Sequence, residues 1–249
     1  MFFTQKNNLE LHKEKLKFKH LHGKAKILYI WDYYKFPIVI LCIVIYILGF
    51  TIYRNFTQKS VLLSAALVNV APDDSLMEQL RNGYITTQDI DSSQYEVRLY
   101  TGLYLTNNEN DPNHEYTYAS RMKILGAIDS EALDIVFMNK EAFDAFAQNG
   151  YLCNLDELLS KTDEKLYQKL SKYLQTNMVI LEDNSMDLYF DDSITYSAKT
   201  EEYPMALDIS QFPCIKNANM NGNIYLGIIT NSPHISESVN YIDYLFENN

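Results

Sequence analysis

The sequence predicts a three-layer α/β domain with a mostly parallel β-sheet, preceded by a single transmembrane helix. Two observations support this prediction. An uncharged run of eighteen residues occupies positions 36–53, and strand-like and helix-like segments alternate through most of residues 61–249. Alternation of strands and helices is typical of sheets whose parallel strands are joined by helical crossovers.

The uncharged run from Phe36 to Tyr53 is long enough to cross a lipid bilayer. An α-helix rises about 1.5 Å per residue, so the run spans about 27 Å, close to the roughly 30 Å of the hydrocarbon core. Tyr34 and Tyr53 lie at its ends, with Lys35 and Arg54 beside them. Aromatic rings and cations at both ends are typical of a membrane interface. We therefore expect a membrane-spanning helix rather than the core helix of a soluble protein.

The net charge differs strongly between the two sides of this run. Residues 1–35 contain eight lysines and three acids, a net charge of +5, whereas residues 36–249 contain 13 basic and 29 acidic residues, a net charge of −16. The lysine-rich flank of a single-pass protein stays in the cytoplasm, which predicts a cytoplasmic N-terminus and an extracellular C-terminal domain. Thirty-five residues precede the run. That length favours an uncleaved signal anchor over a cleaved signal peptide.

The chain is therefore expected to have four parts. They are a basic cytoplasmic segment (1–35), the transmembrane helix (36–53), a stalk (54–60) and an extracytoplasmic domain (61–249). The last part has 189 residues, enough for one domain with a sizeable core. Its acidity argues against nucleic acid as a partner. Its two cysteines, Cys153 and Cys214, form either one disulfide or two free thiols.

The expected elements of the domain follow from hydrophobic periodicity and from capping residues. Strands are expected at 61–70, 95–105, 133–138, 203–209 and 224–230. Helices are expected after Asp73 or Asp74 toward Gly83, at 115–127, between Asn139 and Gly150, from 154, at 163–175 and from 232. The nearly continuous apolar character of 133–138 predicts a parallel strand that is covered on both faces.

The segment 178–197 predicts a hairpin in which MVIL and MDLYF are the strands and a tight polar turn joins them. Acidic residues surround it: Glu182, Asp183, Asp187, Asp191 and Asp192. A pair of catalytic carboxylates is one interpretation. We favour the other, in which these are exposed acids of an edge strand.

Three segments resemble known bacterial proteins. LDIVFMNKEAFDAFAQNGYLCNLDELL (133–159) and GIITNSPHISESVNYIDYLFEN (227–248) are similar to two stretches of extracellular solute-binding proteins of ABC transporters. YIWDYYKFPIVI (29–40) resembles the anchor of membrane-tethered outer-surface proteins of Gram-positive bacteria. The resemblance implies one lobe of a periplasmic-binding-protein-like fold and a non-enzymatic binding module.

The sequence departs from that family in length. Solute-binding proteins hold their ligand between two lobes, but only about forty-five residues separate Leu159 from the strand YPMALDIS, too few for a second lobe. A protein partner could supply the missing wall. The alternative function is therefore a structural or partner-binding module of a cell-envelope membrane complex.

The sequence contains no glycine-rich phosphate loop, nucleophile elbow or metal-binding motif, so we expect neither enzymatic activity nor a metal or cofactor. Expected partners are the lipid bilayer, through residues 36–53, and either a small solute or a membrane protein. Ligands of open α/β sheets bind at the carboxyl ends of strands. Candidate binding residues there are Asn69, Asp73, Asn139, Lys140, Ser210, Gln211, Asn231 and Ser232. Helix capping and turn formation are the alternative roles of these residues.

Overall fold

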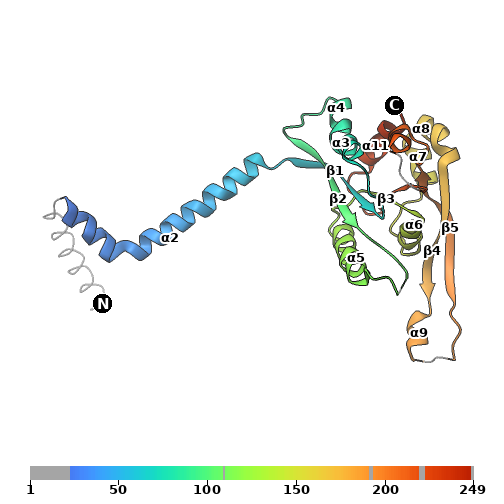
Figure 1. The fold of residues 1–249 in the computed structure, drawn as a ribbon, viewed down its shortest axis with the longest axis horizontal. Helices are drawn as coiled ribbons and strands as arrows, with labels where there is room; N and C mark the ends of the chain where they lie inside the picture. The colour runs from blue at the N-terminus through green and yellow to red at the C-terminus, as the bar shows by residue number, and fades with distance from the viewer. Residues whose placement is uncertain (1–22, 109, 191–192, 219–221, 248–249) are drawn as a thin grey trace, which may run out of the picture. The chain divides into compact units, whose positions relative to one another are not determined.

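The structure is a computed structural model that describes residues 23–108, 110–190, 193–218 and 222–247 (Figure 1). The chain divides into two compact units, Met1–Gln58 and Lys59–Asn249. The described part of the first unit is the helix α2 (Lys24–Thr57). Its segment Tyr34–Arg54 is long and apolar enough to cross a membrane, and its apolar side chains are exposed. Because α2 continues to Thr57, most of the expected stalk 54–60 is helical.

The second unit is built on a six-stranded sheet. Its strands are β1 (Ser60–Val68), β2 (Tyr95–Leu103), β3 (Ile135–Met138), β4 (Leu174–Asp183), β5 (Ala198–Asp208) and β6 (Tyr225–Ile228). They lie in the order β2-β1-β3-β6-β5-β4, which places β2 and β4 at the edges.

The sheet is mixed rather than mostly parallel. β1 pairs in parallel with β2 and β3, whereas β3 with β6, β6 with β5, and β5 with β4 pair antiparallel. The α/β prediction is confirmed, but the prediction of a largely parallel sheet is wrong. The reason lies in the last three strands, which are separated only by the short helices α9 (Ser185–Phe190) and α10 (Pro213–Asn217). Parallel neighbours need longer crossovers.

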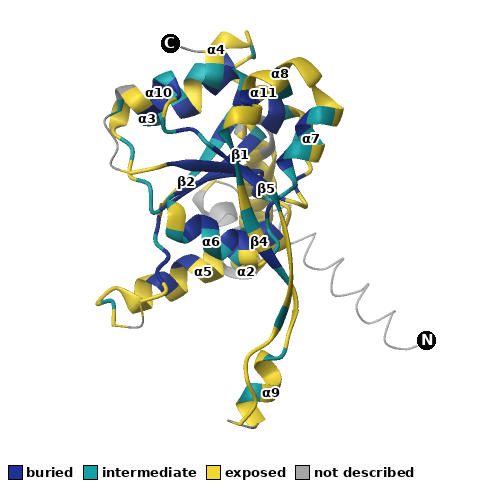
Figure 2. Ribbon diagram, turned by 90° about the vertical axis from the view of Figure 1, so that its right-hand side faces the viewer, coloured by how far each residue is buried: buried dark blue, intermediate teal, exposed yellow. Residues whose placement is uncertain are grey.

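Helices pack on both faces of the sheet (Figure 2). One apolar cluster joins the sheet to α3 (Asp74–Glu78), α4 (Tyr84–Thr87), α7 (Leu155–Thr162), α8 (Glu164–Leu170), α10 and α11 (Ile235–Glu247). A second cluster joins it to α5 (His114–Asp129) and α6 (Lys140–Gln148). A π-helical turn, Gln79–Gly83, connects α3 to α4, and a 3-10 turn, Ser171–Tyr173, follows α8.

The strand β3 shows how this arrangement follows from the sequence. Ile135 and Phe137 belong to the first cluster, and Val136 and Met138 belong to the second. Successive side chains of a strand point to opposite faces, so an entirely apolar strand fits a sheet that is covered on both sides.

Capping residues begin the helices where the sequence predicts. Oδ1 of Asp73 accepts a hydrogen bond from Leu76 N at 2.8 Å, and Oδ1 of Asn139 accepts one from Ala142 N at 3.0 Å. Each cap satisfies a backbone donor that has no partner within its helix.

The strands β4 and β5 extend beyond the rest of the sheet. β5 pairs with β6 only through Leu207 and Asp208, but its pairing with β4 continues as far as Asp183 opposite Ala198. We call residues 178–202 the β4–β5 arm; 191–192 lie outside the described residues. Figures 1 and 2 show the arm projecting from the domain with α9 at its end.

The arm differs from the predicted hairpin in one respect. MVIL belongs to β4 as expected, but MDLYF is helical, within α9, and the returning strand begins only at Ala198. Asp183 and Asn184 favour this arrangement, because Asp183 bonds Ser185 at the start of α9 and Asn184 bonds the backbone of Thr195 and Ser197 beyond it.

Candidate functional site

Two of the predicted site residues, Asn69 and Asn139, meet at the carboxyl ends of β1 and β3. Nδ2 of Asn69 lies 3.1 Å from Oδ1 of Asn139. Asn69 also bonds both backbone groups of Leu105: its Nδ2 donates to the carbonyl at 2.7 Å, and its Oδ1 accepts from the amide at 2.8 Å. The two side chains therefore fasten the loops that follow β1, β2 and β3.

A hollow of about 630 Å³ lies beside this pair. Its walls include the apolar residues Val70, Pro72 and Met77, and the carboxylate of Glu141 lies at its rim. Oε1 of Glu141 accepts hydrogen bonds from Thr106 Oγ1 at 2.9 Å and from Asn107 N at 2.7 Å. The side chains of Asn69, Asn139 and Glu141 beside the hollow are thus engaged in bonds within the protein.

Four more predicted residues lie on the same side of the sheet, at or near the carboxyl ends of β1, β3 and β5. Asp73 caps α3, and Lys140 forms an ion pair with Asp144 on α6. Ser210 and Gln211 follow β5, which runs in the direction of β3 because both are antiparallel to β6. Ser210 Oγ accepts from Ile224 N at 2.9 Å, and Gln211 is exposed.

The last two predicted residues, Asn231 and Ser232, lie at the opposite end of the strands. They follow β6, which runs antiparallel to β3, so the expectation that they join the other six is wrong. Asn231 Nδ2 donates to the carbonyl of Ile128 at 2.7 Å, and Ser232 Oγ donates to Oδ1 of Asp134 at 2.6 Å.

Asp134 organises a polar cluster that the sequence analysis missed. Its carboxylate is buried, and it accepts from Ser64 N at 2.6 Å and from Ser232 Oγ. Nδ1 of His234 lies 3.1 Å from the same carboxylate. In a nucleophile–base pair the serine donates to the histidine ring, but here Ser232 donates to Asp134. The cluster instead ties β1 and β3 to the turn that precedes α11.

The two thiols of the domain are free, which decides between the two alternatives left open by the sequence. Burial raises the pKa of both Cys153 and Cys214 to about 11. Since the thiolate is the nucleophile and metal ligand, neither thiol is reactive near neutral pH. Within the part of the chain that the structure describes, there is also no group of three or more His, Cys, Asp or Glu side chains placed to hold a metal ion.

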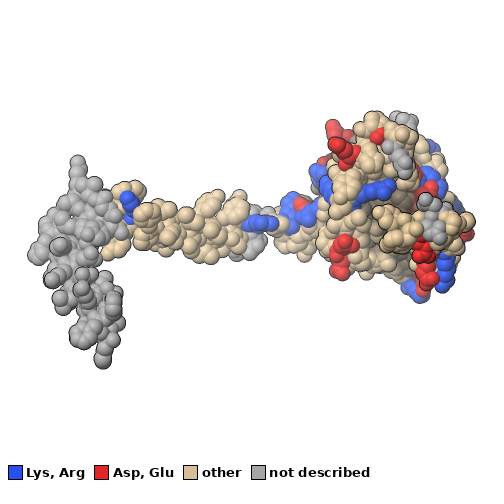
Figure 3. Space-filling view, turned by 90° about the horizontal axis from the view of Figure 1, so that it is seen from below, with Lys and Arg blue, Asp and Glu red and all other residues tan. Residues whose placement is uncertain are grey.

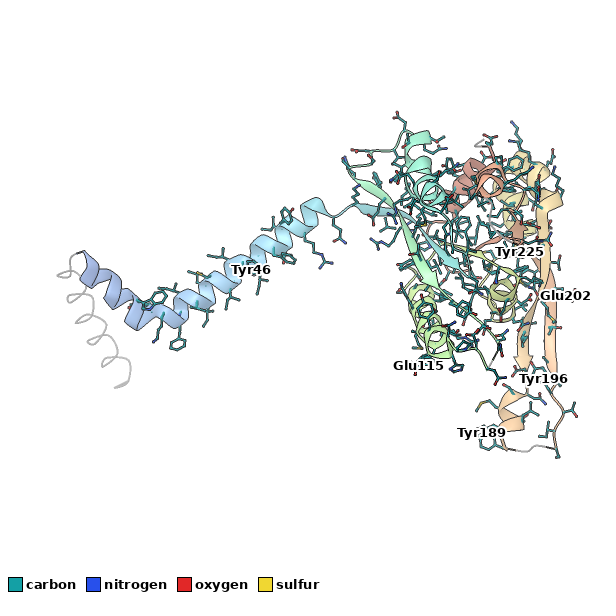
Figure 4. The ribbon with its side chains drawn as sticks, viewed as in Figure 1. Tyr46, Glu115, Tyr189, Tyr196, Glu202 and Tyr225 are labelled. Atoms are coloured by element: carbon teal, nitrogen blue, oxygen red, sulfur yellow. The ribbon has the colours of Figure 1, made fainter. Side chains whose placement is uncertain are left out.

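The end of the arm carries an exposed apolar cluster, which we call the arm tip. Met186, Tyr189 and Phe190 are 71%, 84% and 78% exposed. Leu181, Ile194 and Tyr196 are exposed as well and complete the cluster. Figure 4 shows Tyr189 and Tyr196 at the far end of the arm. The sequence does not reveal this surface, because apolar side chains in a strand-like run are indistinguishable from core residues.

Hydrogen bonds hold the tip in a defined conformation. Asn184 Nδ2 donates to the carbonyl of Thr195 at 3.0 Å, and its Oδ1 accepts from Ser197 N at 2.7 Å. Asp183 Oδ1 accepts from both the hydroxyl and the amide of Ser185. These bonds, the hydroxyl's above all, lower the pKa of Asp183, so it stays ionised at neutral pH.

The base of the arm is anchored to the domain. Val179 is buried against the second apolar cluster. Asn177 Nδ2 donates to Oδ1 of Asp144 on α6 at 2.7 Å. The arm therefore leaves the domain from a packed base and ends in exposed apolar side chains.

Comparisons of the chain with protein family models, with curated proteins and with solved structures give no match. The resemblance to solute-binding proteins thus remains a prediction from the sequence.

Proposed function

We propose that the protein is a membrane-anchored, non-enzymatic module that binds another protein through the arm tip. The exposure of Met186, Tyr189 and Phe190 carries this proposal. Exposed apolar clusters on soluble domains mark interaction sites, and aromatic side chains and Met are enriched in the cores of protein interfaces. None of the three contributes appreciably to the core, so folding of the domain does not explain them.

The anchor is α2, whose segment Tyr34–Arg54 has the length and composition of a membrane span. The charge difference between residues 1–35 and 36–249 supports a single-pass topology with the N-terminus in the cytoplasm and the domain outside. In this proposal the protein presents the arm to a neighbour in or on the cell envelope.

Binding of a small solute at the hollow is the second candidate function. Its volume of about 630 Å³ falls within the usual range for ligand pockets, roughly 300–1,000 Å³. Against it, Asn69, Asn139 and Glu141 already bond to groups of the protein itself. A solute would meet mainly apolar walls there, with few polar groups to orient it.

Photocrosslinking of the full chain in cells tests the proposal. A photoreactive amino acid at Tyr189 should give a discrete protein adduct, and the added substitution Phe190→Ser should abolish it. The same amino acid at Tyr118 on α5, which is 65% exposed, is the matched control and should give no such adduct. Identical adducts from both positions, or none from Tyr189, would contradict the proposal.

A thermal-shift screen of the chain against sugars, peptides and amino acids tests the second candidate. A ligand at a hundredfold over its Kd adds about 2.7 kcal/mol of stability. Val70→Trp, which fills the hollow, should remove any shift that arises there, whereas a shift that survives this substitution would place the ligand elsewhere.

A further inference from the structure

We infer that the surface that receives the arm tip is positively charged: an apolar pocket of a partner protein, bordered by Lys or Arg side chains. This inference rests on the proposed protein-binding function and adds the chemistry of the partner.

The evidence is the charge of the arm that carries the apolar tip. The arm contains seven acids and one base, Lys199, a net charge of −6 in 25 residues. The described acids of the arm are Glu182, Asp183, Asp187, Glu201 and Glu202, and all five are exposed. The first three lie next to the tip, whereas Glu201 and Glu202 lie opposite Val179 and Met178 nearer the base of the arm. Asp191 and Asp192 lie outside the described residues. Figure 3 views the molecule from the side toward which the arm projects and shows acidic, basic and uncharged side chains on that face.

Lys199 lies opposite Glu182 across the β4–β5 pair, but no ion pair among the described residues includes an acid of the arm. One of these ion pairs joins Arg98 to Glu96, and the other four join a lysine or histidine to an acid elsewhere in the domain. Among the described residues, the donors to Asp183 are neutral groups of Ser185 and Tyr196. Its charge and those of its neighbours remain available to cations of a partner.

The same charges argue against two other occupants of the tip. A bilayer with anionic headgroups would repel an acidic arm. A second copy of this chain would also repel it, because residues 59–249 contain 12 basic and 29 acidic residues, a net charge of −17. A basic surface on a different protein is the occupant that charge complementarity favours.

Apolar and acidic residues should then act on different steps of binding. Long-range attraction between the arm and a basic surface increases the association rate and is screened by salt, with a Debye length of about 10 Å at 0.1 M. Burial of Tyr189 and Phe190 in the pocket slows dissociation. The salt dependence of binding therefore tests whether the partner surface is positively charged. Loss of an aromatic ring tests whether the partner has an apolar pocket.

The test uses the full chain with the photoreactive amino acid at Tyr189, in membranes prepared from cells, at 50 and 300 mM NaCl. The charge variant is Glu182→Gln, Asp187→Asn, Glu201→Gln and Glu202→Gln. Its matched control neutralises four exposed acids elsewhere, Asp74→Asn, Glu115→Gln, Asp129→Asn and Glu131→Gln. We expect the charge variant to lower the initial rate of adduct formation about tenfold at 50 mM NaCl and to remove its salt dependence. The control variant should keep both.

The outcomes separate this inference from the proposed function. If Phe190→Ser abolishes the adduct but the charge variant behaves like its control, the protein-binding function stands and the basic partner surface is wrong. If the label transfers to lipid, or if no adduct forms with any variant, both are wrong. Circular dichroism of each purified variant confirms that loss of the adduct does not reflect unfolding.

Discussion

The carboxyl ends of β1 and β3 differ from the tip of the β4–β5 arm in how their side chains are satisfied. At the strand ends, polar residues such as Asn69 and Asn139 form hydrogen bonds within the protein and begin or fasten its elements. At the tip, apolar residues such as Tyr189 and Phe190 face solvent. Polar residues at strand ends are thus explained by folding alone, whereas the exposed rings of the tip are not. The difference makes the tip the stronger functional candidate.

The largest expected effect is the loss of a core ring. Phe146 on α6 is 2% exposed and packs in the second apolar cluster, so Phe146→Ala should lower the free energy of unfolding of residues 59–249 by about 3–5 kcal/mol. Urea unfolding measures the change. A loss below about 1 kcal/mol would show that this face of the sheet is not packed as described.

High pH should destabilise the core. Burial raises the pKa of Cys214 to about 11, whereas the thiol of the unfolded chain loses its proton near pH 8.5. The protonated thiol of Cys214 therefore makes its full contribution to the free energy of unfolding below about pH 8.5. As the pH rises toward 11, this contribution is lost, and the free energy of unfolding falls by about 2–3 kcal/mol. Urea midpoints at pH 8 and 10.5 measure the loss. Cys214→Ala should make the dependence on pH shallower, and an unchanged slope would contradict this assignment.

Loss of a polar residue at the strand edge should have an intermediate effect. Asn139→Ala removes the cap of α6 and the bond to Asn69, so the free energy of unfolding should fall by about 1–2 kcal/mol. The exposed Gln211 at the same edge is the control, and Gln211→Ala should change stability by less than about 0.5 kcal/mol. Equal effects of the two substitutions would remove the structural role given to Asn139.

The smallest effect is expected at the tip. Phe190 is 78% exposed, so Phe190→Ala should change the free energy of unfolding by less than about 0.5 kcal/mol while it abolishes the adduct formed at Tyr189. A destabilisation above about 2 kcal/mol would mean that the ring packs against the domain. That result would contradict the proposal that the tip is a binding surface.

The elements that the sequence predicted well have local signals. Asp73 and Asn139 cap helices through their own neighbours, and the apolar run 133–138 needs cover on both faces wherever it lies in the sheet. The direction of β6 has no local signal, because an apolar strand looks the same beside a parallel or an antiparallel neighbour. MDLYF was predicted as a strand for a related reason, since five residues are too few to distinguish helical from strand periodicity.

The candidate site was predicted in part. Asn69 and Asn139 meet because both follow parallel strands, which is a consequence of topology that the sequence could anticipate. Asn231 and Ser232 were misplaced together with the direction of β6. The arm tip was missed because exposure is a property of the folded chain. Met186, Tyr189 and Phe190 have the composition of a core segment and are known to be exposed only from the structure.

The position of β4 at the edge of the sheet affects whether copies of the protein can pair through their strands. Its outer side presents unpaired amide and carbonyl groups, a template on which strands of other molecules could add and polymerise. Where the outer halves of two arms overlap, Glu182 and Asp183 of both copies come close and repel each other. Like-charge repulsion between these acids therefore opposes pairing of one arm with another.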